Sequence, residues 1–188
     1  MKRSSAFFTG TGGNSYSFYV VATSNVGNVQ NANTQTAAVT THSLTPINYW
    51  RWENFSIPSN TGVAADTVSV DHDGIPNLLK YGLVIPPGKS GSDMLPSSQV
   101  INYTDGKFLS MNFVRDSSRN DITLLVQAAN NPGGPWTTVA SSVNGAVFTG
   151  NGFVSETDAG SGLNTVQVRD VVNTTGASRR FMRVLVTH

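Results

Sequence analysis

Residues 180–187, Arg-Phe-Met-Arg-Val-Leu-Val-Thr, form the stretch that decides the fold class. Three apolar side chains, Met182, Val184 and Val186, occupy alternate positions and would share one face of an extended chain. Period-two alternation of this kind is typical of a β-strand with one buried face, because a helix would repeat about every 3.6 residues instead. The end of the chain therefore predicts a half-buried strand.

Six further candidate strands precede this one, at a spacing of about ten residues. Turn signals separate them, such as Asn-Asn-Pro-Gly-Gly at 130–134 and Asn-Gly at 144–145. Short strands at regular spacing predict an antiparallel β-sandwich or jelly roll for residues 99–188. The strands are predicted at 99–103, 108–114, 122–128, 136–140, 146–154, 165–170 and 180–187.

The composition supports a mainly β chain and excludes several kinds of function. Ser, Thr and Asn make up nearly a third of the 188 residues, and only 12% are charged, a balance that favours strands and turns over long helices. The net charge of +1 leaves no basic surplus for phosphate contacts, so nucleic acid is not expected as a partner. The absence of Cys excludes disulfides and thiolate metal sites. No apolar run reaches the roughly 18 residues of a membrane span.

Residues 1–44 are predicted to end in a β-hairpin. Residues 16–23 are aromatic and β-branched, residues 24–28 carry Gly and Asn suited to a turn, and residues 36–41 would form the return strand. The pattern Y-x-F-Y-V-V-A-T-S-N-V-G resembles the F strand and F–G turn of a fibronectin type III domain, over about a third of such a domain. Because two strands cannot bury their inner face alone, this partial domain is expected to dock on the rest of the chain or on a partner.

The helical signals of the chain lie within residues 45–98. Thr45-Pro46 combines an N-cap with a proline at the first helical position. In the helix that follows, Trp52 and Phe55 are three residues apart, which predicts that both belong to one buried apolar stripe.

A second short helix is predicted over residues 76–81. Gly82 and the two prolines that follow at 86 and 87 would end it. A Gly/Ser/Pro-rich linker occupies residues 88–98. The chain is thus predicted to have three parts: a partial fibronectin type III-like hairpin at 1–44, a helix–calcium loop–helix connector with its linker at 45–98, and the sandwich at 99–188.

The motif with the clearest chemistry is Ala-Asp-Thr-Val-Ser-Val-Asp-His-Asp-Gly-Ile-Pro-Asn at residues 65–77. Oxygen-bearing side chains recur at alternate positions, at Ser69, Asp71 and Asp73, and a glycine follows. Calcium takes six to eight oxygen ligands at about 2.3–2.6 Å from a loop that turns sharply around the ion, and a glycine at the sixth position permits that turn. Counted from Ser69, the stretch is close to an EF-hand loop and predicts a Ca2+ site.

The predicted calcium ligands combine carboxylates with neutral oxygens. An EF-hand has Asp at position one and a bidentate Glu at position twelve, where this chain has Ser69 and Lys80. The loss of two carboxylates is expected to weaken the site, and Asp66, three residues upstream, would restore one charge. The expected ligands are the side chains of Asp66, Ser69, Asp71, Asp73 and Asn77, the backbone carbonyl of Ile75, and water.

The string W-R-x-x-N-F … N-T-G-V-A-A-D … D-x-D-G-I-P-N-L-L-K-Y-G-L resembles a module near the C-terminus of large secreted bacterial proteins. That module carries A-D-x-D-G-D-G-x-x-N-L-L-E-Y-A-L-G after a W-R-x-x-x-F helix, often behind fibronectin type III domains, and its loop is similar to thrombospondin type 3 and dockerin calcium motifs. The tail R-R-F-x-R-V-x-V, residues 179–186, also fits, so the resemblance extends over most of residues 16–188. It implies a calcium-stabilised extracellular module without a defined reaction. This copy departs from the pattern at Ser69, Lys80 and Gly82.

The leading functional interpretation is therefore a calcium-binding, non-catalytic extracellular module, a structural or adhesive part of a larger secreted protein. Its expected partners are other domains of that larger chain, a second copy in a homo-oligomer, or a glycan. The extracellular location is implied by the resemblance alone, because the apolar run at residues 6–8 is too short for the core of a signal peptide.

Two alternatives stay open. His72, between two carboxylates and next to a bound calcium ion, could act as the base of a calcium-dependent hydrolase of an ester or lactone. Alternatively, Trp136 and Tyr103 could stack on sugar rings, which would make the chain a carbohydrate-binding module.

Overall fold

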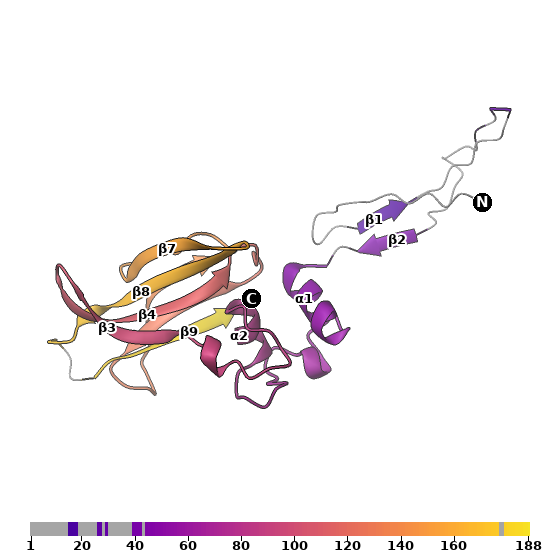
Figure 1. Cartoon of the computed structure of the whole chain (residues 1–188). Coiled ribbons are helices and arrows are strands. Elements are labelled where there is room, and N and C mark those ends of the chain that lie inside the picture. Colours follow the sequence, from indigo (N-terminus) through magenta and orange to yellow (C-terminus); the bar gives the residue numbers. More distant parts are fainter. Residues whose placement is uncertain (1–14, 19–25, 28, 30–38, 43, 177–178) are drawn as a thin grey trace. The chain divides into compact units, whose positions relative to one another are not determined.

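The computed structural model describes residues 15–18, 26–27, 29, 39–42, 44–176 and 179–188 (Figure 1). The chain divides into two compact units, Met1–Thr45 and Pro46–His188. In the first, strand β1 (Ser15–Phe18) pairs antiparallel with β2 (Val39–His42). Most of the predicted fibronectin-like hairpin, including residues 24, 25 and 28 of its turn, lies outside the described residues.

The second unit contains two antiparallel sheets, which confirms the mainly β sandwich class (Figure 1). One sheet has four strands in the order β3-β4-β8-β7, and the other has three in the order β6-β5-β9. Each neighbouring pair in these sheets is antiparallel. The strands are β3 (Ser97–Tyr103), β4 (Gly106–Asp116), β5 (Thr123–Ala129), β6 (Thr137–Val143), β7 (Phe153–Gly160), β8 (Leu163–Asn173) and β9 (Phe181–Thr187).

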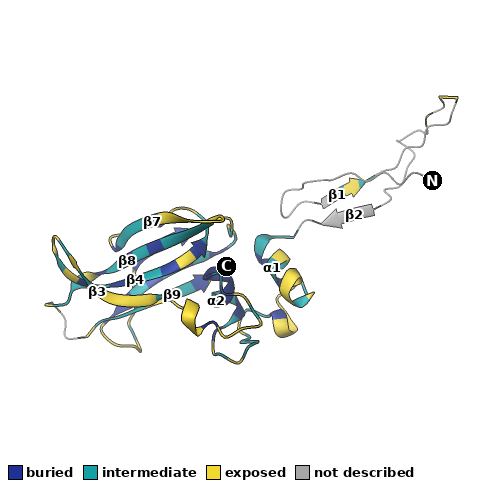
Figure 2. Ribbon diagram, viewed as in Figure 1, coloured by how far each residue is buried: buried dark blue, intermediate teal, exposed yellow. Residues whose placement is uncertain are grey.

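The hydrophobic core lies between the two sheets. Alternate positions of β8 and β5 are buried, and β4 alternates likewise except at Ser110 and Met111, which are both buried beside a shift in its register with β8 (Figure 2). This alternation follows from the two-residue period of a strand, which places every second side chain on the inner face. The inner faces contribute Met111, Phe113, Val166 and Val168 from the first sheet, and Leu124, Val126, Ala140 and Val186 from the second.

Six of the seven predicted strands are present, with boundaries shifted by a few residues. The strand predicted at 146–154 is wrong over most of its length, because β7 begins only at Phe153. The preceding residues form a turn with one isolated bridge, from Ser141 to Thr149. Gly150 has a φ of 126°, in the region that favours glycine, and this interrupts an extended run. Phe148 leaves the turn and packs edge-on against Phe113 in the core.

Helix α1 (Pro46–Phe55) packs a different tryptophan against the core from the one predicted. Trp52 is 51% exposed, whereas Trp50 packs against Phe55 and Tyr81 with ring centroids 5.6 and 5.5 Å apart. The predicted stripe rested on the three-residue spacing of Trp52 and Phe55 alone. Ile47 and Trp50 contact the hydrophobic core, and they determine which side of α1 faces it.

Three short helices complete the second unit. They are the single-turn 3-10 helices η2 (Gly62–Ala64) and η3 (Ser92–Met94), and the α-helix α2 (Asn77–Gly82), which begins one residue later than predicted. In the described part of the chain, none of the helices has the length and apolar character needed to cross a membrane.

Helix α2 approaches strand β9 closely, and Gly82 makes this possible. A Cβ atom at Gly82 would lie 2.6 Å from Cγ2 and 3.0 Å from Cγ1 of Val186. Packed carbon atoms approach each other to about 3.5–4.0 Å, so a side chain at this position has no room. The resembled pattern has alanine at this position, and the close approach of Val186 explains why this chain has glycine.

We expect Gly82→Ala to lower the free energy of unfolding by about 1–3 kcal/mol, since the added methyl group forces α2 away from β9. The measurement is a urea unfolding curve. The matched control is Gly82→Ala combined with Val186→Ala, which makes room for the methyl group and should lose less stability than the sum of the two single changes. Simple additivity of the two changes would contradict this account.

Candidate functional site

The predicted calcium-binding stretch folds as a compact loop ahead of α2. We call residues 66–76 the acidic loop. His72 and Gly74 both have positive φ, 55° and 76°, so the chain turns sharply where the pattern places its glycine. The first backbone N–H groups of α2 are satisfied by the loop, because Asn77 N donates to Val68 O and Leu78 N donates to Asp66 O. The loop therefore caps the helix through its backbone.

The ammonium group of Lys80 occupies the centre of the acidic loop. Its Nζ atom lies 2.5 Å from Asp71 Oδ2 and 2.7 Å from Asp73 Oδ2. The side chain of Lys80 is 0% exposed, and those of Asp71 and Asp73 are 12% and 7% exposed. Charge-assisted hydrogen bonds of this length are stronger than neutral ones. One internal cation thus bridges two of the predicted calcium ligands.

Asp71 and Asp73 also accept hydrogen bonds from neighbouring backbone N–H groups and from Ser69. Asp71 Oδ1 accepts a hydrogen bond from Gly88 N at 2.9 Å. Asp73 Oδ1 accepts from Ile75 N and from Ser69 Oγ, and Asp73 Oδ2 accepts from Gly91 N in addition to Lys80. Because Gly88 and Gly91 lie beyond α2, the two aspartates join the predicted linker to the loop.

The charges in this cluster stabilise one another. The hydrogen bond from Lys80, opposed by burial and helped by the Ile75 and Gly91 amides, holds the pKa of Asp73 well below its usual range. For Lys80, burial alone would lower the pKa, but the hydrogen bonds and charges of Asp71 and Asp73 outweigh burial and raise it. Both shifts favour the ionised pair at neutral pH.

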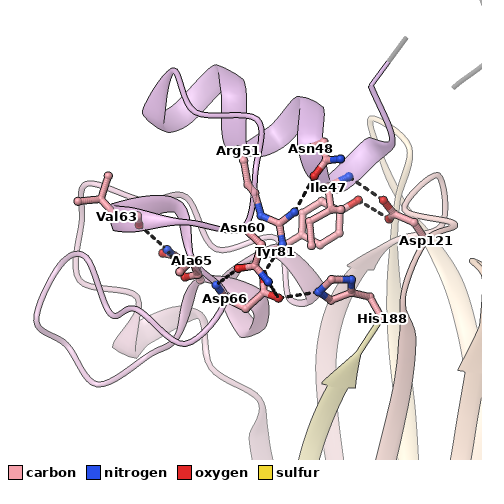
Figure 3. A network of polar contacts seen from close by, with 11 residues as sticks. Ile47, Asn48, Arg51, Asn60, Val63, Ala65, Asp66, Tyr81, Asp121 and His188 are labelled. Carbon is pink, nitrogen blue, oxygen red and sulfur yellow. Dashed lines mark hydrogen bonds and ion pairs between the residues drawn. The ribbon is translucent and has the colours of Figure 1, made fainter. Parts of the chain in front are cut away.

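Asp66 belongs to a second polar cluster, shown in Figure 3. Its carboxylate forms an ion pair with Arg51 of α1, accepts from Asn60 Nδ2 at 2.8 Å, and accepts from His188 Nε2 at 2.5 Å. Arg51 is 2% exposed and also donates to Asn48 Oδ1. Asp66 therefore connects α1, the loop and the end of the chain.

Asp121, in the turn between β4 and β5, joins both helices to the sandwich (Figure 3). Its Oδ2 accepts from Ile47 N at 2.7 Å, at the start of α1, and its Oδ1 accepts from Tyr81 Oη at 2.8 Å, in α2. Arg119 adds to this contact, because its guanidinium lies 4.5 Å from the Tyr81 ring centroid and donates to Tyr81 O. Burial and then the hydrogen bond to Asp121 raise the pKa of Tyr81 far above 10.0, so its hydroxyl stays protonated.

Acid should weaken the contacts of Asp66. Burial tends to raise its pKa, but the hydrogen bonds of His188 and Arg51 outweigh burial and lower the pKa below 3.8. A carboxyl whose folded-state pKa is depressed contributes stability above its unfolded-state pKa and loses it as the pH falls through the folded-state value. We expect the urea concentration at the unfolding midpoint to decrease as the pH is lowered below about 4. The decrease should be less steep in Asp66→Asn, because the asparagine side chain does not titrate. Equal acid dependence in the two proteins would contradict this assignment.

The structure brings only part of the predicted calcium ligand set together. Asp71 and Asp73 meet at Lys80, and Ser69 donates to the other oxygen of Asp73, whereas Asp66 pairs with Arg51 elsewhere. Among the described residues, no three His, Asp or Glu side chains are grouped so that they could hold one metal ion. As arranged, the loop does not fit Ca2+, because an ammonium group lies where two of the ligands converge.

Two further predicted ligands, Asn77 and Ile75, also make contacts that hold the loop in place. Asn77 is 1% exposed, and its Nδ2 donates to Val63 O and Ala65 O, while its Oδ1 accepts no hydrogen bond from the described residues. Ile75 is buried in the core, and its backbone N–H is bound to Asp73. These contacts fix the loop against η2 and the core.

The residues of the alternative functions lie apart from one another. His72 is exposed at the tip of the acidic loop. Tyr103 is in β3 and Trp136 precedes β6, so the two rings belong to different sheets. Each is half-buried with an arginine against one ring face, Arg169 on Tyr103 at 4.9 Å and Arg183 on Trp136 at 4.3 Å. A sugar ring could stack only on the opposite faces.

Sequence reasoning missed the residues that fasten the loop to the sandwich. Arg51 lies within the quoted W-R-x-x-N-F pattern, but its buried position was not expected. Asp121 carried no signal, since an aspartate in a turn between strands is usually solvated. Lys80 was identified only as the missing twelfth ligand. The signal that could have indicated its ion pairs was a positively charged residue at position twelve of a loop that contains two aspartates.

Comparison with known protein families, with curated proteins and with solved structures gave no match to this chain.

Proposed function

We propose that residues 46–188 act as a non-catalytic β-sandwich module, a structural or adhesive part of a larger extracellular protein. In this role the helix–loop–helix segment, from α1 to α2 (residues 46–82), is a fixed part of the module and does not move relative to the sandwich. The observation that carries the structural role is the double contact of Asp121, which accepts hydrogen bonds from both α1 and α2. The extracellular setting is taken from the sequence resemblance alone.

Two further contacts support a fixed segment. Asp66 in the loop is bound to His188 at the end of β9, and Gly82 of α2 packs directly on Val186 of β9. Together with Asp121 they attach the helices to both the β4–β5 turn and β9. Several separate attachment points restrict rotation of the segment far more than one contact would.

The polar side chains of the site also favour a structural role. Catalysis needs a positioned nucleophile and base that can reach a substrate. Here the carboxylates of Asp66, Asp71 and Asp73 are engaged with Arg51 and Lys80 inside the protein. Calcium binding, which the sequence predicts, would require Asp71 and Asp73 to exchange the Lys80 ammonium for the ion.

Native-state hydrogen exchange on the full chain tests the proposal. If the segment and the sandwich unfold as one unit, the amides of Leu83 and Ile85, bonded to α2 carbonyls, should be protected about as strongly as those of β5. In Asp121→Ala, protection should fall in α1 and α2 while the central strands keep most of theirs. Asp93→Ala, which removes an exposed carboxylate of η3, is the matched control and should change neither.

Two results would overturn the proposal. One is rapid exchange of the α2 amides in the unmodified protein, because the segment would then open independently of the sandwich. The other is calcium-dependent hydrolysis of an ester or lactone that His72→Ala abolishes at unchanged stability, because the module would then be an enzyme.

A further inference from the structure

We propose that Lys80 takes the place of the metal ion in the acidic loop, so that the loop is closed by a cation of the chain itself and its stability does not depend on calcium. This inference rests on the proposed structural role of the segment and names the means by which its loop is held. It also gives a reason for the departure at position twelve, where the resembled pattern has a glutamate.

The position of the ammonium group is the first argument. In a calcium loop of this spacing, the ion lies between the side chains at positions three and five and is approached by the residue at position twelve. Here position twelve supplies the cation rather than a ligand, and Lys80 Nζ contacts both Asp71 Oδ2 and Asp73 Oδ2. The charge that would come from calcium comes from the helix.

The burial of Lys80 is the second argument. A lysine without any exposed side-chain surface is rare unless its charge is paired, and its only pairing groups in the described part of the chain are these two carboxylates. Calcium entering between them would meet the ammonium group at close range.

The linker supplies the third argument. Asp71 Oδ1 accepts a hydrogen bond from Gly88 N, and Asp73 Oδ1 accepts one from Ile75 N. Asp73 Oδ2 accepts from Gly91 N as well as from Lys80 Nζ. A calcium ion would compete for these oxygens, whereas an ammonium group leaves them free to accept. Lys80 therefore closes the loop and allows the linker to be held by the same carboxylates.

The test compares the full chain with Lys80→Glu and Lys80→Gln, each melted in calcium and in chelator. For the unmodified protein we expect the same Tm in both conditions and no heat of binding on calorimetric titration with calcium chloride. Lys80→Glu places a third carboxylate beside Asp71 and Asp73. Its Tm should fall in chelator and rise by about 5 °C or more in saturating calcium.

Lys80→Gln is the matched control, because it removes the ammonium group without supplying a carboxylate. It should be destabilised in both conditions and regain less stability in calcium than Lys80→Glu. Should Lys80→Glu fail to fold, Asp71→Asn combined with Asp73→Asn provides the second test, and its loss of Tm should be the same in calcium and in chelator.

The inference would be overturned by calcium binding to the unmodified protein that raises its Tm and disappears in the Asp71→Asn, Asp73→Asn variant. That outcome would establish the calcium loop that the sequence predicts, and it would leave the proposed structural role intact. Failure of the structural role is a separate result, because it would appear in the hydrogen exchange of α2 whatever the calcium response.

Discussion

Arg115→Met should lower the free energy of unfolding by about 3–5 kcal/mol, because it leaves a buried carboxylate without its cation. Arg115 is 1% exposed between the sheets. Its Nε donates to Glu156 Oε1 at 2.6 Å, its Nη1 donates to Ser142 Oγ at 2.9 Å, and its Cζ lies 5.3 Å from the centroid of the Phe148 ring. The measurement is the urea unfolding curve at neutral pH.

A second change separates the charge from the packing of Arg115. In Arg115→Met combined with Glu156→Gln, the unpaired charge is gone. Phe148 N and Asn164 Nδ2 donate to different oxygens of Glu156, so the single amide oxygen of the glutamine keeps one of these two hydrogen bonds. We expect the double variant to be more stable than Arg115→Met alone. Equal stability of the two would show that Arg115 acts through packing and not through its charge.

Tyr81→Ala should cost a similar amount, about 3–5 kcal/mol, because it removes a large buried ring and leaves a cavity. Tyr81 is 1% exposed, packs against Trp50, and carries the Arg119 guanidinium on its ring. The loss should appear in thermal and urea unfolding, together with a change in the fluorescence of Trp50.

The hydroxyl of Tyr81 makes a separate contribution to the free energy of unfolding. Tyr81→Phe keeps the ring but leaves Asp121 Oδ1 without its donor, and we expect a loss of about 1–2 kcal/mol. If the hydroxyl mattered only through Asp121, the double variant Tyr81→Phe, Asp121→Ala should be no less stable than Asp121→Ala. A further loss in the double variant would reveal another role for the hydroxyl.

The alternation of apolar residues was sufficient to predict the sandwich. Met182, Val184 and Val186 lie on the inner side of β9 as their spacing indicated, and all three contact the core. Residues 146–152 were predicted as part of a strand but form a turn, and the reason lies in the local backbone. A run that contains Phe148 and β-branched residues favours a strand locally, but Gly150 and the isolated bridge to Ser141 bend the chain into the core instead.

The inward-facing polar residues were harder to predict. Arg115 continues the two-residue alternation of Met111 and Phe113, so its position on the inner face was open to prediction. Its partner Glu156 belongs to β7, which pairs with β8 and not with β4. Nothing in the local sequence of either residue indicates that these strands bring their side chains together.

The acidic loop shows the limit of motif reasoning most clearly. The spacing of Ser69, Asp71 and Asp73 predicted three oxygen-bearing groups turned toward one centre; Asp71 and Asp73 converge on Lys80, and Ser69 is bonded to Asp73. Whether the ammonium group of Lys80 meets these aspartates depends on which way its side chain points from α2. That direction is set by packing of the helix on β9, which a pattern of ligand positions does not contain.

The tight crossing of Gly82 and Val186 has a consequence for how sequences of this kind can diverge. A methyl group can be accepted at position 82 only if the branched side chain opposite becomes smaller or the helix shifts outward. Homologues with alanine at position 82 should therefore carry a smaller residue at position 186. The two positions are then expected to covary although they are far apart along the chain.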